Sequence, residues 1–235
     1  MASLRFLPAS QIPLAAAVLV LLATAIGHAA NGPKAVVASP KSEDDQVKQF
    51  ISVVLAETED YWGISFKANG LKYEEPKLVL FTGNIHSACG PVSGTTYCNT
   101  DHKIYLDPNS PEFQKAAAIG DFAEAIVVAR QVAHHVQNIL SVRFPIDAQS
   151  LEIEREVDCF AGLWTRYVQD KGLLEDDDLT EARQYLRHLG EQSAGNAAAD
   201  LMSGSVGTPE DRLLWYERGI AGIGITSCNA SDYPP

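Results

Sequence analysis

The residues with the clearest potential for chemistry are one imidazole and two carboxylates, on two segments with a helical pattern. His134 lies in an apolar stretch at 121–142, and Glu154 and Asp158 lie in the next helical stretch. Because Glu154 and Asp158 are four residues apart, they share one face of a helix. Imidazole and carboxylate groups together bind zinc and related metal ions. Alone, the second segment also fits a solvated acidic face beside Arg155, and it is the pairing with His134 that points to a metal site.

The residues just before His134 depart from the motif that such a site requires. In His-Glu-x-x-His, two histidines one turn apart bind zinc, and the glutamate takes a proton from the metal-bound water. Arg130 stands at the first histidine position and Gln131 at the glutamate position. Arginine stays protonated and has no lone pair to donate, and glutamine cannot act as a base. The pattern therefore indicates a metallopeptidase-type helix that has lost one ligand and its general base.

The elements that position these residues are expected to form a mostly helical α+β domain with a small β-sheet. Apolar periodicity and capping residues predict helices over about 43–67, 110–118, 121–142, 149–171, 178–199 and 209–222. Short alternating stretches predict strands at 77–82 and 102–107, with a loop at 83–100 between them. The 235 residues, 46% of them apolar, suffice for one domain with a sizeable core.

The N-terminus has the features of an export signal. A single charge, Arg5, precedes an apolar run from Pro13 to Ile26, and the small residues Gly27 and Ala29 suit a cleavage site. The alternative is an uncleaved membrane anchor at 13–26, although a full span needs ~20 residues. We expect a periplasmic or extracellular protein made of a signal peptide, a linker and one domain, at 1–29, 30–42 and 43–235.

The charge of the chain argues against two classes of partner. The 30 Asp and Glu residues outnumber the 18 Lys and Arg residues, for a net charge of −12, and removal of the signal would also remove Arg5. Binding of nucleic acid relies on a positive surface that neutralises phosphates, as does attraction to anionic lipids. We therefore expect no nucleic-acid partner, and membrane contact only if the N-terminal segment stays attached.

All four cysteines lie downstream of the signal segment, at Cys89, Cys98, Cys159 and Cys228. An even number of cysteines in an oxidising compartment predicts two disulfides. Three pairings are open on the sequence alone. A Cys89–Cys98 bond would close a short loop, and a Cys159–Cys228 bond would tie a central helix to the C-terminal segment. A zinc site of four thiolates is a poor alternative, because the chain has no close Cys-x-x-Cys pair.

A series of segments in fixed order carries a wider resemblance. They are Val53–Asp60, Leu78–Phe81, Ser87–Gly90, Tyr97–Cys98, Asp101–Asp107, His134–Asn138, Glu154–Trp164, Asp211–Arg212 and Trp215–Gly219. In this series the chain resembles the bacterial neutral zinc metallopeptidases, a family with a zincin-like fold. The resemblance covers nearly all of the exported part and is far more specific than a single short motif.

The resemblance implies roles for the residues that match. His134 corresponds to the second zinc histidine and Glu154 to the third zinc ligand. Asp158 would accept the ring N–H of a ligand histidine and fix its tautomer. Arg130 and Gln131 stand where the first zinc histidine and the catalytic glutamate belong. The resemblance also implies zinc as cofactor and a peptide or protein as partner, and the two replacements predict that zinc is lost here.

These replacements lead to a specific hypothesis. Arg130 shares a helix face with His134, so its guanidinium is expected at the zinc position, paired with Glu154 and Asp158. It would neutralise carboxylates whose burial without partners is costly. The protein would then be a pseudopeptidase that binds its partner in the old cleft, between the strand near Ile104 and the helix with His134. An active zinc peptidase with a remodelled metal site and a purely structural envelope protein are the alternatives.

Other candidates for chemistry carry weaker signals. Four further histidines are not expected to bind metal: His86, His102, His135 and His188. We expect His135 to pack on the far side of its helix, and a site rebuilt from His134, His135 and His102 is the alternative. A serine hydrolase is not expected, because no His/Asp partner pattern accompanies Ser93, Ser203 or Ser205. Cys159 is expected in a disulfide and not as a nucleophile.

Overall fold

The computed structural model describes residues 42–140, 150–195 and 207–229. The expected signal peptide at 1–29, nearly all of the expected linker at 30–42, and Ser203 and Ser205 lie outside these residues. Six α-helices are described, α1 Glu43–Ala68, α2 Pro111–Ala117, α3 Asp121–Leu140, α4 Ser150–Asp170, α5 Asp178–Gly195 and α7 Pro209–Ala221. Five short strands and one 3-10 helix accompany them, β1 Lys77–Leu80, β2 Asn84–Ser87, β3 Gly90–Ser93, β4 Thr96–Cys98, β5 Lys103–Leu106 and η2 Ile225–Cys228. The mostly helical α+β class is confirmed.

Capping residues explain several of the helix starts. The side chains of Ser42, Ser110 and Thr208 accept hydrogen bonds from backbone N–H groups in the first turns of α1, α2 and α7. Proline occupies the first turn of α2 and of α7, where its missing N–H costs nothing. These helices accordingly begin within one residue of the predicted positions.

The segment 83–100, expected to be a loop, contains three strands. β2 pairs with β3 as an antiparallel hairpin, and β4 pairs with β5. Each strand is only three or four residues long, and half of the positions in β2 and β3 are exposed, so the segment lacks a clear period-2 pattern of apolar residues. Partner strands and a disulfide stabilise these strands in place of a continuous buried face.

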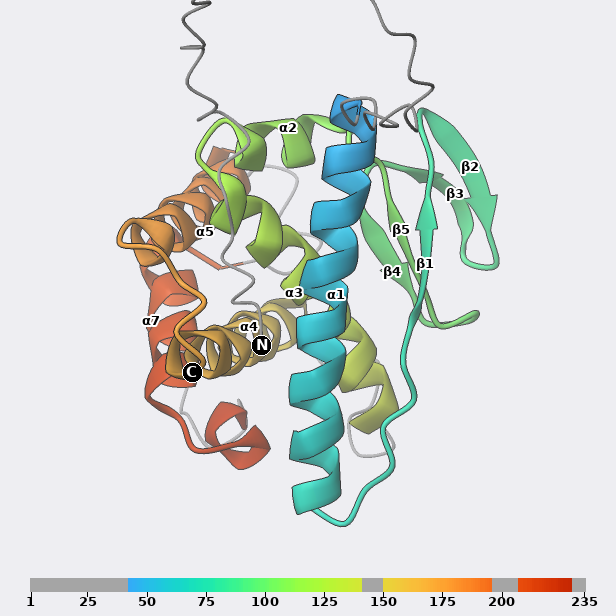
Figure 1. Ribbon diagram of the computed structural model, residues 1–235. Coiled ribbons are helices and arrows are strands. Elements are labelled where there is room, and N and C mark those ends of the chain that lie inside the picture. The colour runs from blue at the N-terminus through green and yellow to red at the C-terminus, as the bar shows by residue number, and fades with distance from the viewer. Residues whose placement is uncertain (1–41, 141–149, 196–206, 230–235) are drawn as a thin grey trace, which may run out of the picture.

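The main sheet has the strand order β1-β5-β4, with β1 parallel and β4 antiparallel to β5. Figure 1 shows this sheet and the β2–β3 hairpin on one side of α1, with α5 and α7 on the other side. β5 begins at Lys103 because the preceding residue, His102, has a positive φ of 56° and is therefore not extended. After β5, the Asp107 carboxylate accepts hydrogen bonds from the backbone N–H groups of Gly83 and Asn109, at 3.0 and 2.9 Å.

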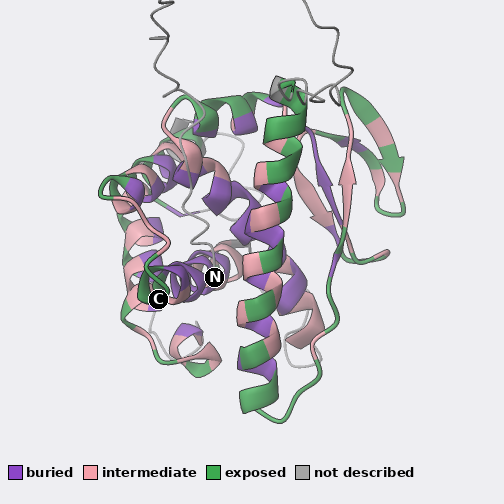
Figure 2. Cartoon of the chain, in the orientation of Figure 1, coloured by how far each residue is buried: buried purple, intermediate pink, exposed green. Residues whose placement is uncertain are grey.

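The core is built around α3, which is buried over most of its length (Figure 2). This helix packs against α1, α2, α4, α5 and β4. Phe122 on α3 stacks on Trp164 of α4, with ring centroids 5.8 Å apart. Three polar side chains on α3 are also buried, namely Arg130, Gln131 and His135. A helix this enclosed requires partners for such groups, and those partners define the candidate site.

α4 and α7 approach each other at a pair of glycines. A Cβ added to Gly162 would lie 2.1 Å from the carbonyl oxygen of Tyr216, and one added to Gly219 would lie 2.0 Å from the carbonyl oxygen of Cys159. The two backbones can pack this closely only because neither glycine has a side chain. This contact holds the C-terminal half of α7 against the middle of α4.

Replacement of Gly162 by alanine is therefore expected to lower the free energy of unfolding by about 2–3 kcal/mol, because α4 and α7 must separate. Urea unfolding followed by circular dichroism measures the change. Gly63→Ala on α1 is the matched control, since a Cβ there meets nothing within 4 Å, and alanine should stabilise that helix slightly. Equal effects of the two substitutions would contradict the close packing.

The first cysteine of the chain is bonded to the second, and the third to the fourth. Cys89 is bonded to Cys98 and Cys159 to Cys228.

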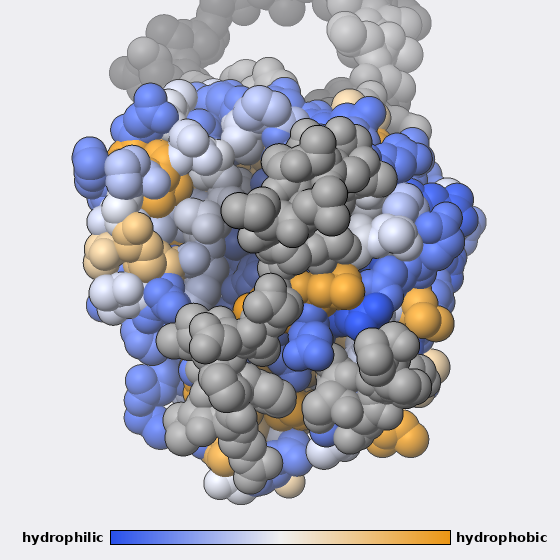
Figure 3. Space-filling view, turned by 180° about the vertical axis from the view of Figure 1, so that it is seen from behind, coloured by the Kyte–Doolittle hydropathy of each residue, from blue (hydrophilic) through white to orange (hydrophobic). Residues whose placement is uncertain are grey.

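The face turned away from the view of Figure 1 is largely hydrophilic, with separate hydrophobic patches (Figure 3). Among the described helices, none is both long and apolar enough to cross a bilayer.

Candidate functional site: a buried ion-pair centre

Three helices bring the charged side chains of the candidate site together. α3 carries Arg130 and His134 one turn apart, α4 carries Glu154 and Asp158 one turn apart, and α7 contributes Arg212. α3 packs on α4, and α4 packs on α7. Arg130, Asp158 and Arg212 are only 5%, 0% and 4% exposed. The charges therefore meet inside the core, where each needs a partner.

Arg130 lies between the two carboxylates, as the sequence predicts. Its Nε donates to Oδ1 of Asp158 at 2.8 Å, and its Nη2 forms an ion pair with Oε2 of Glu154. Both carboxylates come from α4, so the guanidinium joins α3 to α4 through two charge-assisted hydrogen bonds. The guanidinium of Arg130 therefore contacts Glu154, the carboxylate expected from the sequence to be the third zinc ligand.

Arg212 is a second arginine at this centre, which the spacing of the sequence did not predict. Its Nη1 donates to Oδ2 of Asp158 at 2.9 Å, and its Nη2 lies 3.3 Å from Oε2 of Glu154. The only signal in the sequence is the place of Arg212 within the series of family segments. Two arginines thus face two carboxylates, and the centre is balanced in charge.

Burial raises the pKa of Asp158, and the charges of Arg130 and Arg212 act against this rise. Burial opposes the ionisation of Glu154, but the positive charge of Arg130, with His134 and Arg212, outweighs it and lowers the pKa of Glu154 to about 2. Burial lowers the pKa of His134, and the charges of Arg130 and Arg212 add to this effect, while Glu154 and a hydrogen bond with Gln137 act in the opposite direction. We therefore take Glu154 as ionised and His134 as neutral at neutral pH.

His134 and Gln131 complete the list of predicted site residues. Nε2 of His134 lies 3.7 Å from Oε1 of Glu154, and the side chain is 24% exposed. Gln131 is 6% exposed and provides an amide where a carboxylate base would be needed. His134 is the part of the centre that is most open to solvent.

His135 points away from this centre, as expected. Its Nδ1 lies 3.0 Å from the Tyr97 hydroxyl and its Nε2 lies 2.6 Å from the carbonyl oxygen of Glu74. The His102 ring packs against it, with centroids 5.9 Å apart. Both ring nitrogens of His135 are occupied, so the structure gives no support to a metal site rebuilt from His134, His135 and His102.

Comparison with known families identifies the family of the chain. The model of the family described as "Putative neutral zinc metallopeptidase" matches residues 17–231. The chain belongs to this neutral zinc metallopeptidase family. The resemblance seen in the sequence is confirmed.

Two relatives show the extent of the similarity. Uncharacterized protein YpfJ of Escherichia coli strain K12 is 34% identical over 208 residues, which cover 79% of this chain and 72% of YpfJ. Uncharacterized protein Rv2575 of Mycobacterium tuberculosis strain H37Rv is 37% identical over 108 residues, which cover 40% of this chain and 37% of the relative. No solved structure matches the chain.

Zinc is the cofactor expected of a neutral zinc metallopeptidase, but the residues at this centre do not fit it. A catalytic zinc site has three protein ligands. Here His134 and Glu154 offer ligand atoms, Asp158 is held by two arginines, and the third position carries the cationic Arg130. Within the described residues, a single group of at least three His, Cys, Asp or Glu side chains has its ligand atoms within 4.8 Å of one another, and it lies elsewhere.

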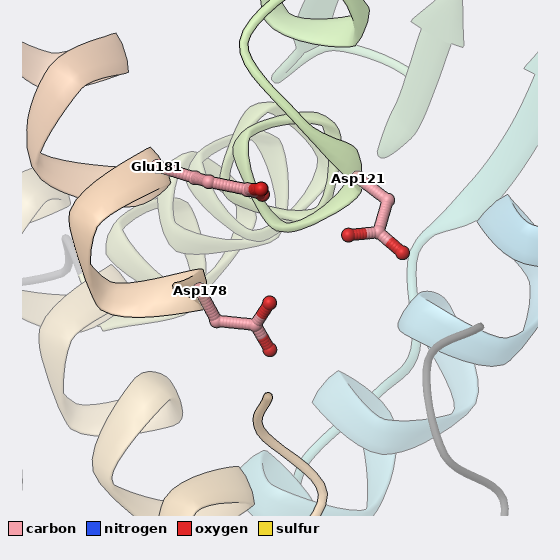
Figure 4. Close-up of side chains that lie close together, drawn as sticks. All are labelled: Asp121, Asp178 and Glu181. Atoms are coloured by element: carbon pink, nitrogen blue, oxygen red, sulfur yellow. The ribbon is translucent and has the colours of Figure 1, made fainter. Parts of the chain in front are cut away.

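That group consists of Asp121, Asp178 and Glu181, whose carboxylates point into a common space (Figure 4). Glu181 accepts a hydrogen bond from the Phe122 N–H at 3.0 Å, and Asp178 accepts one from the Glu175 N–H at 2.8 Å. One oxygen of Asp121 is buried without a hydrogen-bond partner in the described structure. The Glu181 bond fixes the start of α3 and the Asp178 bond fixes the start of α5, so the cluster acts structurally on the helix that carries Arg130 and His134.

The acidic cluster predicts a specific pH dependence. Burial, followed by the negative charges of Asp121 and Glu181, raises the pKa of Asp178 to about 7. The folded state therefore holds a proton that the unfolded state has already lost, and stability falls as pH rises from about 4 to about 7. Asp178→Asn should stabilise the protein more at pH 8 than at pH 5, by roughly 1–3 kcal/mol.

Urea unfolding at the two pH values measures the difference. The amide oxygen of asparagine can still accept the hydrogen bond from Glu175. Asp176→Asn, at an exposed neighbouring position, is the control and should show little change with pH. A gain from Asp178→Asn that is the same at both pH values would contradict the assigned protonation.

A hollow of about 290 Å³ lies apart from the ion-pair centre, between α1, α4 and the loop after α7. Its rim includes Ile64 and Ile223, which are 61% and 99% exposed. The charged residues in its wall, Arg166 and Asp170, pair with each other at 2.9 Å. The hollow therefore offers apolar contact and no arrangement for acid–base chemistry.

Proposed function

We propose that this protein is an exported pseudopeptidase of the neutral zinc metallopeptidase family, which binds a peptide or protein segment and does not hydrolyse it. The observation that carries the proposal is the position of Arg130, whose guanidinium contacts Glu154 and Asp158 in the centre that the family uses for zinc. The positive charge of Arg130 would repel a dication, and Gln131 cannot take a proton from water. Two independent parts of the hydrolytic chemistry are therefore missing.

The proposed binding surface lies beside His134, between α3 and β4. β5 is the middle strand of the sheet and Ile104 is fully buried, so we propose β4, and not the strand near Ile104, as the strand beside the binding surface. Among the described strands, β4 pairs only with β5. An extended segment can add to a free backbone edge, while pockets beside it select side chains. Tyr97 and Asn138, joined by a hydrogen bond of 2.9 Å, connect β4 to α3 near this surface.

Export is supported by the N-terminal sequence and by the cysteines. The apolar run from Pro13 to Ile26 follows a single positive charge. Both disulfides are of the kind that persists in an oxidising compartment. We place the folded domain outside the cytoplasmic membrane, as a secreted or periplasmic protein, or as one held by residues 13–26.

Metal content tests the loss of hydrolysis. Elemental mass spectrometry on dialysed, disulfide-bonded protein should find well below one zinc per chain, and EDTA should leave the melting temperature unchanged. About one zinc per chain, together with peptide hydrolysis that EDTA abolishes, would instead favour an active peptidase with a remodelled metal site.

Peptide selection tests the binding function. A displayed library of random peptides, selected on the mature protein, should yield sequences whose binding falls about tenfold or more in His134→Ala, a loss of about 1.4 kcal/mol. His188→Ala on α5 is the matched control, because His188 hydrogen-bonds to Gln192 on its own helix, outside the ion-pair centre. Failure to enrich any peptide would favour a purely structural role, and equal binding by both variants would contradict a binding surface beside His134.

A further inference from the structure

We infer that Arg130 and Gln131 form a charge-matched pair that replaces a zinc ion and its neighbouring glutamate, and that the rest of the centre retains a latent zinc site which two substitutions restore. The inference rests on the loss of zinc in the proposed function but concerns the chemistry of the centre itself. It is supported by charge, by spacing and by the hydrogen bonds of Arg130.

The charge argument compares two versions of the same helix turn. A zinc dication with a histidine at 130 and an ionised glutamate at 131 would bring one net positive charge. Arg130 with the neutral Gln131 also brings one net positive charge. In either version the partners are the same, namely Glu154, Asp158 and Arg212, whose contacts the structure gives. The two replacements thus keep a buried centre neutral, and neither does so alone.

The spacing argument concerns the ligands that remain. Two ligand atoms that each lie about 2.1 Å from one tetrahedral zinc are about 3.4 Å apart. His134 Nε2 and Glu154 Oε1 are 3.7 Å apart, close to that separation although no metal ligand set is complete. Position 130 is one turn before His134 on the same helix face. A histidine there would supply the missing third ligand.

The contacts of Arg130 also indicate where a histidine at 130 would find support. Arg130 Nε donates to Asp158 at 2.8 Å, so an imidazole at this position has a carboxylate within reach of its second ring nitrogen. Such a carboxylate fixes the tautomer of a zinc-binding histidine. Asp158 is itself held by Arg212 at 2.9 Å, and this contact does not depend on Arg130. The support for a ligand histidine is therefore already in place.

The experiment compares wild type with Arg130→His, Gln131→Glu and the double variant, each produced with and without zinc. Zinc per chain is measured after dialysis, and melting temperature is measured with zinc and with EDTA. We expect the double variant to hold about one zinc per chain and to melt more than about 5 °C higher with zinc than with EDTA. Wild type and Gln131→Glu should hold well below one zinc.

Two controls separate a specific site from nonspecific effects. Arg166→His places a histidine beside Asp170 on the exposed side of α4, and it should not acquire zinc. Gln169→Glu adds a negative charge at an exposed position of the same helix. Gln131→Glu should lower the melting temperature more than Gln169→Glu does, because only Gln131 lies in the charge-balanced core.

Several outcomes would overturn the inference. A folded double variant without zinc would do so, as would a double variant that fails to fold even with zinc. Gln131→Glu with no larger effect than Gln169→Glu would contradict the charge match. A wild type that holds as much zinc as the double variant would contradict both this inference and the proposed loss of zinc. Failure of peptide selection on wild type would affect the proposed binding function alone.

Discussion

Replacement of Asp158 by asparagine is expected to lower the free energy of unfolding by about 3–5 kcal/mol. Asp158 is fully buried and accepts hydrogen bonds from Arg130 at 2.8 Å and from Arg212 at 2.9 Å. The amide has nearly the same shape as the carboxylate, so the effect comes from charge and from the hydrogen bond that its NH₂ group cannot accept. Two buried guanidinium groups would be left with Glu154 as their only carboxylate at this centre.

Urea unfolding at pH 7 measures this loss. Asp170→Asn on the same helix is the matched control, because its ion pair with Arg166 is exposed and should contribute less than about 1 kcal/mol. A double-mutant cycle sharpens the test. Arg212→Gln should be less destabilising in the Asp158→Asn background than in wild type, since it then removes an unmatched charge. Additive effects would contradict the charge balance on which the centre depends.

The helices could be predicted from the sequence because each carries its own local signals. Caps at Ser42, Ser110 and Thr208, and the long apolar pattern of α3, are properties of consecutive residues. The strands of the segment 83–100 could not be predicted in this way. Their pairing depends on residues elsewhere, such as the register of Cys98 opposite Lys103, and three residues are too few to show a period.

One part of the candidate site could be predicted from the sequence, and another part could not. The pairing of Arg130 with Glu154 and Asp158 follows from two helix faces and the resemblance to a known family. Arg212 lies on a third helix, and its approach to Asp158 depends on the contact between Gly162 and Gly219. No local pattern specifies a contact between helices so far apart in the sequence. The burial of Arg212 is likewise a property of the packed structure and not of its neighbours in the chain.

Removal of the Cys159–Cys228 disulfide, by alanine at both positions, is expected to lower the free energy of unfolding by about 4 kcal/mol. The two cysteines are 69 residues apart, and in the loop-entropy model a longer closed loop restricts the unfolded chain more. Cys159 directly follows Asp158, and Cys228 follows α7, so the bond links α4 to the segment beyond the helix that carries Arg212. Its loss should therefore reach the ion-pair centre.

The matched control is the double alanine replacement of Cys89 and Cys98, which are nine residues apart and should cost about 3 kcal/mol. Hydrogen exchange distinguishes the two variants by location. Without Cys159–Cys228, amide protection should fall in α7 and in the turn of α4 around Asp158. Without Cys89–Cys98, it should fall in β2 to β4 and leave α7 unchanged. If α7 keeps its protection in both variants, the glycine contact and the two arginine–carboxylate bonds alone are sufficient to hold it, and the disulfide does not act on the centre.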